Sequence, residues 1–282
     1  MELGLQLYSV REELEKDFLG TLEKVAQIGY TNVELAFHNV ENNINIGGMT
    51  AKEFKEQLDH FGLKAVSSHV HPIEKVNWRD MIAFNHTIGS SALVCPMKFF
   101  KDRDDVLRFC ENLNDYGNLC EKEGISFYYH NHFQEFQKFG QDSAFDIMID
   151  NTDPSLVRFE FDTYWALRGG VDPIHYLKKL DSRCDLIHQK DLPAGVSPVN
   201  AFERLDTNEP VSMETFIPFS KQEYFTEVGH GVMNIDDILQ TAKVLGYAKY
   251  VFVEQDLTSL NQIKSVEKSF KHLASRTHFS YK

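Results

Sequence analysis

Acidic and basic side chains stand in pairs, two residues apart, at the ends of short apolar runs in this sequence. The pairs are His130/His132, Glu160/Asp162, His188/Lys190 and Glu254/Asp256. Residues i and i+2 of a β-strand point to the same side of the sheet, so each pair presents both side chains to one face. If those faces share one interior, carboxylates and imidazoles from four strands converge there.

Such a convergence calls for a cation, because buried carboxylates repel one another and lose their hydration. A mixed carboxylate and imidazole set without cysteine suits a divalent ion such as Mn²⁺, Mg²⁺, Co²⁺ or Zn²⁺. Taken singly, a histidine or aspartate after a strand is more often a hydrogen-bonding or helix-capping residue. The joint pattern predicts one bound divalent metal ion, with Mn²⁺ favoured.

Short strands must position these residues, and the chain offers eight apolar or β-branched candidates. The expected strands are Leu3–Tyr8, Val33–Ala36, Lys64–His69, Ala92–Pro96, Ser126–His130, Val157–Asp162, Asp185–Lys190 and Tyr250–Asp256. Between them, helical periodicity and capping residues predict helices. These cover Glu15–Ile28, Thr50–Phe61, Asp104–Glu123, Asn234–Leu245 and Leu257–Leu273, with a further helix opening at Asp172-Pro173.

A repeating strand–helix pattern implies parallel strands with right-handed crossovers. At 282 residues, the natural solution is a single (β/α)8 TIM barrel spanning 1–282. An open doubly wound sheet is the alternative, but Leu7-Tyr8-Ser9 stands where a glycine-rich phosphate loop would follow the first strand. The long irregular stretch at 191–233 is expected to be an active-site loop region.

The amino-acid composition limits the classes of molecule that the protein is expected to bind. The chain has 42 acidic and 29 basic residues, a formal net charge of −13, and no basic run longer than Lys178-Lys179. This balance argues against nucleic-acid and anionic-membrane partners and favours a small neutral or weakly anionic substrate. Scattered cysteines and the lack of a long apolar run predict a cytoplasmic protein. The sequence leaves open whether it forms a homo-oligomer.

Motifs spread over nearly the whole chain carry a family resemblance. They include GLQLYSVR at 4–11, SSH at 67–69, YHNH at 129–132, FEFDTYW at 159–165, HQKD at 188–191, VGHG at 228–231 and VEQD at 253–256. In this order they resemble the sugar phosphate isomerase/epimerase family, with its xylose isomerase-like barrel. The wider superfamily includes tagatose 3-epimerase-type enzymes, inosose dehydratases and endonuclease IV.

The resemblance implies a ligand set for the metal. Epimerases of this superfamily hold it with Glu, Asp, His and Glu from strands five to eight. The last three correspond to Asp162, His188 and Glu254. At the first position this sequence has His130, and the nearest acid is Glu135, so either residue is the candidate fourth ligand.

The resemblance also implies roles in proton transfer. Glu254 is the expected base beside a carbonyl that the metal polarises, and His130 or His132 is its expected partner. Lys190 is a candidate to neutralise substrate oxygens, although it could simply pair with its neighbour Asp191. The expected substrate-binding residues are Glu34, His69, Glu135, Trp165 and Asp256.

Four functions remain open from the sequence. The leading hypothesis is a metal-dependent isomerase or epimerase of a keto-sugar or a polyol-derived ketone. A dehydratase or lyase acting on an inosose or 3-keto-glycoside is the nearest alternative, since a histidine in place of the strand-five glutamate suits elimination. An endonuclease IV-like nuclease and a non-catalytic sugar-binding protein are less favoured, and a non-phosphorylated substrate is expected.

Overall fold

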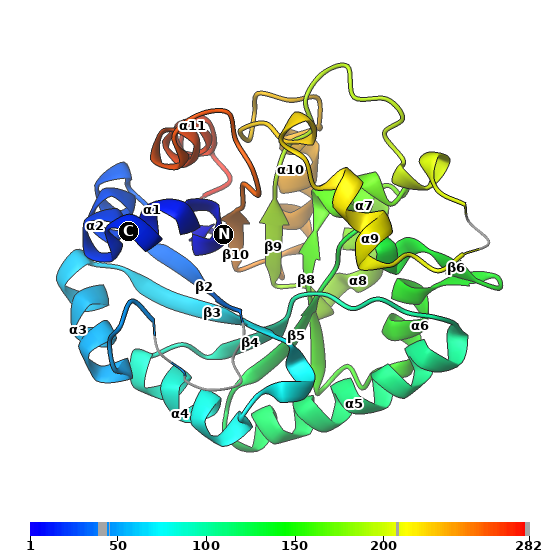
Figure 1. Cartoon of the computed structure of the whole chain (residues 1–282), viewed down its shortest axis with the longest axis horizontal. Coiled ribbons are helices and arrows are strands. Elements are labelled where there is room, and N and C mark those ends of the chain that lie inside the picture. Colours follow the sequence, from blue (N-terminus) through cyan, green and yellow to red (C-terminus); the bar gives the residue numbers. More distant parts are fainter. Residues whose placement is uncertain (39–43, 45, 207–208, 280–282) are drawn as a thin grey trace.

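Eight parallel strands close into a barrel in the computed structural model, which describes residues 1–38, 44, 46–206 and 209–279 (Figure 1). Around the barrel the order is β1-β10-β9-β8-β5-β4-β3-β2, and every neighbouring pair is parallel. The strands are β1 (Glu2–Gln6), β2 (Asn32–His38), β3 (Lys64–His71), β4 (Ala92–Cys95), β5 (Ser126–His130), β8 (Val157–Asp162), β9 (Leu186–Gln189) and β10 (Tyr250–Val253). The predicted (β/α)8 barrel is confirmed, and the open sheet is not found.

Helices surround the strands (Figure 1). The α-helices are α1 (Arg11–Lys16), α2 (Phe18–Ile28), α3 (Ala51–Phe61), α4 (Trp78–Ile88), α5 (Arg103–Lys122), α6 (Ala144–Asn151), α7 (Thr163–Arg168), α8 (Pro173–Leu180), α9 (Met213–Phe216), α10 (Ile235–Leu245) and α11 (Gln262–Ala274). A short antiparallel hairpin lies outside the barrel and consists of two-residue strands, β6 (Lys138–Phe139) and β7 (Asp142–Ser143). No helix within the described ranges is long and apolar enough to cross a membrane.

Local capping explains most helix boundaries. Thr50 and Glu53 form the predicted capping box of α3, which ends at Gly62 in the left-handed conformation, with φ of 69°. The prediction of one helix over Glu15–Ile28 is wrong, because Asp17 caps a new helix by accepting from the Gly20 backbone N–H. The last helix starts at Gln262 rather than Leu257, because Asn261 caps it.

The segment 191–233 is less irregular than its sequence indicates. It contains α9 and the 3-10 turns η5 (Ala201–Arg204), η6 (Ile217–Phe219) and η7 (Gln222–Tyr224). Its apolar side chains join a separate buried cluster that includes Phe133 and Trp165. This cluster covers part of the carboxyl end of the barrel, where α7 follows β8.

A glycine on β1 makes room for an aromatic side chain inside the barrel. Gly4 pairs with Phe252 of β10, and a Cβ on Gly4 would lie 2.5 Å from the Phe252 ring. Phe252 in turn pairs with His188 of β9 and packs 5.8 Å from its ring. The interior below the polar site is therefore filled by side chains, as in other barrels of this type.

Candidate metal centre and cavity

The paired polar residues of the sequence meet at the carboxyl end of the barrel. Asp162 ends β8, His130 ends β5, and His188 lies on β9. Glu254 directly follows β10. All four are buried, with no more than 7% of their surface exposed, although they come from strands far apart in the chain.

These four residues form a group with the dimensions of a metal site. His130, Asp162, His188 and Glu254 each offer one ligand atom, and these atoms all lie within 4.8 Å of one another. His188 Nδ1 is 2.8 Å from Glu254 Oε2, and His130 Nε2 is 3.9 Å from Asp162 Oδ2. Asp162 Oδ1 accepts from the Trp165 backbone N–H, whereas Oδ2 is buried and lies 3.0 Å from Lys190 Nζ.

A second group shares His130 and His188 with the first and includes Glu160. The sequence analysis listed Glu160 among the paired polar residues but gave it no role in the site. His69, His130, Glu160 and His188 also have ligand atoms within 4.8 Å of one another. Glu160 Oε2 lies 2.6 Å from His69 Nε2 and 3.3 Å from His130 Nδ1. The signal was present, since Glu160 precedes Asp162 by two residues on the same strand face.

Glu34 lies beneath the cavity on β2. Its carboxylate accepts from Gln6 Nε2 at 2.8 Å and from the Ser67 hydroxyl at 2.6 Å. Its Oε2 is 2.6 Å from His188 Nε2. Glu34 is fully buried, so its partners are protein groups.

Lys190 is buried among three carboxylates. Its Nζ lies 3.0 Å from Asp162 Oδ2 and 3.3 Å from Asp256 Oδ1, and it also contacts Glu254 Oε2. Only 1% of its side chain is exposed. The alternative pairing with Asp191 is not found, because the Asp191 carboxylate accepts from backbone N–H groups.

The surplus of carboxylates determines the protonation of the histidines beside them. Burial lowers the pKa of His69, but the charges of Glu34 and Glu160 outweigh it and raise the pKa to about 9. Burial acts likewise on His188, yet Glu160, Glu34 and Glu254 raise its pKa well above the usual range. The site therefore attracts positive charge strongly.

Two carboxyl groups on one wall differ in protonation. Burial alone would raise the pKa of Glu254, but Lys190 and His188 hold it well below its usual range. Burial and the neighbouring Glu254 carboxylate raise the pKa of Asp256 to about 7, against the opposing effect of Lys190. Near neutral pH, Glu254 is thus ionised while Asp256 carries a proton for part of the time.

The remaining imidazoles are held neutral. Burial, together with the charges of His188 and the other nearby cations, lowers the pKa of His130 well below the usual value. Burial and Lys190 lower the pKa of His132 to about 3. Neutral imidazoles are the form that ligates a metal or donates a hydrogen bond from one nitrogen.

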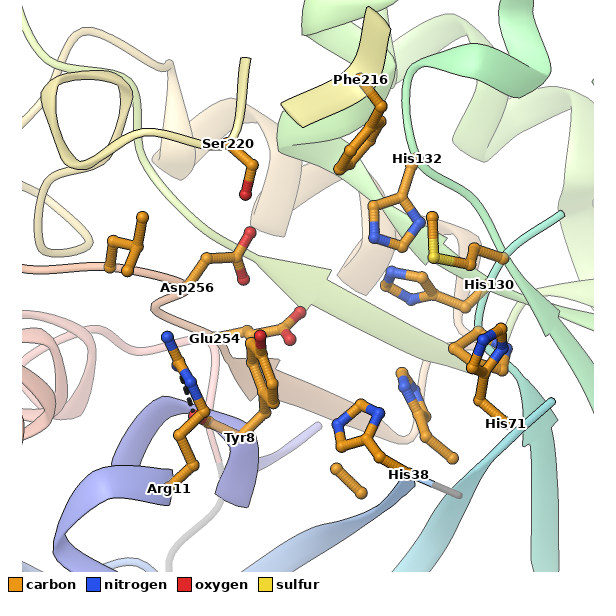
Figure 2. Close-up of a pocket in the computed structure, with 15 residues that line it drawn as sticks. Tyr8, Arg11, His38, His71, His130, His132, Phe216, Ser220, Glu254 and Asp256 are labelled. Carbon is orange, nitrogen blue, oxygen red and sulfur yellow. Dashed lines mark hydrogen bonds between the residues drawn. The ribbon is translucent and has the colours of Figure 1, made fainter. Parts of the chain in front are cut away.

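A cavity of about 360 Å³ opens above this group, within the usual range for small-molecule sites (Figure 2). Its lining includes five residues named from the sequence: His69, His130, His132, Glu254 and Asp256. Sequence reasoning gave no role to several other lining residues, because they lie on helices, strand ends and loops with no distinguishing pattern. These are Tyr8, Arg11, His38, His71, Phe216 and Ser220.

Three predicted substrate-binding residues do not line the cavity: Glu34, described above, Glu135 and Trp165. Glu135 is buried and accepts from the Tyr129 hydroxyl at 2.7 Å and the His132 backbone N–H at 2.8 Å. Burial raises its pKa to about 7. Trp165 is fully buried and packs on Phe133 and Phe216 in the apolar cluster. Neither residue is among those that line the cavity, and Glu135 is in neither four-residue group.

The fold and this site define a family. A family model described as the xylose isomerase-like TIM barrel matches residues 22–276, and the chain belongs to that family. A solved structure called a sugar phosphate isomerase/epimerase, from Parabacteroides distasonis, superposes with a TM-score of 0.78 and 27% identity, covering 99% of each chain. The resemblance read from the sequence motifs is confirmed.

Two further similarities are informative. An inosose dehydratase of Clostridium beijerinckii is 26% identical over 190 residues, which cover 66% of this chain and 59% of that relative. This match thus spans under two thirds of the relative's length. The protein called IolI, whose structure contains a zinc atom, covers 100% of both chains with a TM-score of 0.68 and 15% identity. At that identity the likeness shows the fold alone.

Proposed function

We propose that the protein is a divalent-metal-dependent dehydratase that removes water from a polyhydroxylated ketone. The observation that carries this proposal is the buried group of His130, Asp162, His188 and Glu254 at the floor of the cavity. The family membership and the similarity to inosose dehydratase support the reaction class.

The residues fit a divalent cation on three grounds. One lysine, Lys190, is shared by the three carboxylates of Asp162, Glu254 and Asp256. The ligand atoms of the four-residue group already lie within 4.8 Å of one another. Imidazole and carboxylate donors without thiolate suit Mn²⁺, Co²⁺ or Zn²⁺. We propose His130 as the fourth ligand, since the oxygens of Glu135 accept hydrogen bonds elsewhere.

Acid and base roles follow from the two carboxyl groups on one wall. The metal, when bound, acts as a Lewis acid that stabilises negative charge on a carbonyl oxygen. The ionised Glu254 carboxylate is the proposed base that removes the proton beside the carbonyl. Asp256 is the proposed acid, because its raised pKa lets it donate a proton to the departing hydroxyl group.

Other residues assist from fixed positions. Lys190 is buried beneath the cavity and holds Glu254 and Asp256 in place, so we assign it a positioning role rather than direct substrate contact. His69 and His132 line the cavity and are proposed to bind hydroxyl groups. The segment 191–233 contributes Phe216 and Ser220 to the wall, which supports its proposed role as an active-site loop region of a single domain.

Isomerisation or epimerisation is the second candidate. The 27% identity to a sugar phosphate isomerase/epimerase over 99% of both chains favours it. In that reaction Glu254 would remove the proton, and His132, on another wall, would return one to the substrate (Figure 2). We favour the dehydratase because Asp256, with its pKa raised to about 7, can protonate a departing hydroxyl group, and because the chain is similar to inosose dehydratase.

Metal analysis and product analysis together test the proposal. Purified protein should contain or take up about one divalent ion per chain by mass spectrometry, and Glu254→Ala and His130→Ala should reduce this, whereas Glu135→Ala should not. With Mn²⁺ and an inosose in deuterated water, dehydration gives a product that has lost one water. An isomerase instead gives a product of unchanged composition that carries deuterium. Failure to bind Mn²⁺, Co²⁺ or Zn²⁺ would overturn the mechanism.

A further inference from the structure

An arginine faces the same cavity from the segment that follows β1. Arg11 lines the cavity and is half-buried. Its Nη1 donates to the Tyr8 carbonyl at 2.9 Å, and its Cζ lies 4.0 Å from the centre of the Tyr8 ring. Figure 2 shows the two side chains together on one wall. Stacking and hydrogen bonding thus orient the guanidinium before any ligand arrives.

This guanidinium has no acidic partner in the part of the chain that the structure describes. Its hydrogen bond goes to the Tyr8 carbonyl, which is neutral. Lys190, by contrast, contacts three carboxylates. Arg11 lines the same cavity as Glu254 and Asp256, yet no ion pair joins it to either acid. A partly desolvated cation of this kind is stabilised when an anion binds to it.

Arg11 shares one side of the cavity with two acids. Figure 2 shows Arg11 and Tyr8 on the same side as Glu254 and Asp256, and the His38 ring packs 5.3 Å from the Tyr8 ring. A ligand that places hydroxyl and carbonyl oxygens near the acids can place a different substituent against Arg11. The free edge of a guanidinium matches a carboxylate with two parallel hydrogen bonds.

We propose that Arg11 and Tyr8 form an anion-binding subsite that selects substrates bearing a carboxylate. The proposal rests on the proposed function, because it identifies the substrate as a carboxylated polyhydroxylated ketone. A carboxylate is favoured over a phosphate because, among the described residues, the lining contains a single arginine and no lysine. The sequence also lacks a glycine-rich loop after β1.

Binding of two unreactive probes tests the subsite. Quinate is a polyhydroxylated ring with a carboxylate, myo-inositol is a similar ring without charge, and neither has the ketone that turnover requires. By calorimetry with the full chain, quinate should bind about tenfold or more tightly than myo-inositol. Arg11→Met should abolish that difference without weakening myo-inositol binding, and Arg11→Lys should retain part of it. Arg79→Met, at an exposed position, should change neither affinity.

Each other outcome overturns the subsite. Equal affinities for the two probes, no binding of quinate, or unchanged quinate binding in Arg11→Met would show that Arg11 does not select a carboxylate. Tighter binding of myo-inositol 1-phosphate than of quinate, lost in Arg11→Met, would assign a phosphate instead. Failure of the proposed reaction is distinguishable, because it appears in metal content and product analysis and not in probe binding.

Discussion

Each ring nitrogen of His188 lies close to a different glutamate, and the two glutamates differ in their surroundings. Nδ1 lies 2.8 Å from Glu254, a proposed ligand that lines the cavity. Nε2 lies 2.6 Å from Glu34, which is fully buried and anchored by Gln6 and Ser67. A carboxylate that accepts from the second nitrogen fixes the ring orientation and tautomer of a metal-binding histidine. We infer that Glu34 positions His188 and does not bind substrate hydroxyls.

Replacing this carboxylate should weaken metal binding. Glu34→Gln removes the charged acceptor for His188 Nε2, so the affinity for Mn²⁺ or Zn²⁺ should fall about 10–100-fold. Titration with a competing chelator measures the change. The matched control is Glu227→Gln, because Glu227 is likewise buried and accepts from Thr258, Ser265 and Lys268, but belongs to neither four-residue group and does not line the cavity. Similar metal affinities in the two variants would refute a positioning role for Glu34.

Metal binding should also release a proton. Burial opposes the charged form of His188, but the surrounding glutamates raise its pKa well above 6.5, so its ring is protonated near neutral pH in the metal-free protein. A metal ligand must be neutral, and binding should therefore release about one proton per chain at pH 7. Affinity should rise with pH until His188 is neutral without metal, and then level off. Calorimetry in two buffers of different ionisation enthalpy measures the release, and a release unchanged in His188→Gln would exclude His188 as its source.

At the scale of elements, Asp191, the second residue after β9, binds the end of the long 191–233 segment. Asp191 accepts from the backbone N–H groups of Leu192, Gly229, Gly231 and Met233 at 2.8–3.1 Å. A Cβ on Gly231 would lie 2.3 Å from Asp191 Oδ1, so the glycine permits this close approach. The VGHG motif at 228–231 thus has a structural explanation.

Removing the Asp191 carboxylate should destabilise the fold. Asp191→Ala leaves several buried N–H groups without acceptors, so the free energy of unfolding should fall by about 1–3 kcal/mol. Urea unfolding followed by circular dichroism measures this value. Asp153→Ala removes an exposed carboxylate that accepts from Ser155, and should have a smaller effect. Equal changes in the two variants would contradict the anchoring role.

At the scale of the whole molecule, the net negative charge of this chain argues against a nuclease. The formal charge of −13 repels a polyphosphate backbone at long range. We expect no shift of duplex DNA in a gel at low salt, and no cleavage of DNA with an abasic site by the Mn²⁺-loaded protein. A shift that weakens steeply with added salt would restore the nuclease hypothesis.

The sequence alone determined the barrel and the faces of its strands. β5 and β8 have the predicted bounds, and the capping box of α3 forms as expected, because periodicity and capping act over a few residues. The same local rule placed Glu160 and Asp162 on one face. Local patterns did not predict the helix break at Asp17 or the start of α11 directly after Asn261, since tertiary packing selects among several possible caps.

Only the tertiary structure decided which of those polar residues meet. Barrel closure brings Glu160 within 2.6 Å of His69, 91 positions away along the chain, and Glu34 beside His188, 154 positions away. In the closed barrel Glu135 makes local hydrogen bonds and Trp165 packs in an apolar cluster. Both residues nevertheless follow strand ends, as the residues that line the site do. Side-chain direction on a strand is a local property, whereas contact between strands depends on the register and curvature of the closed sheet.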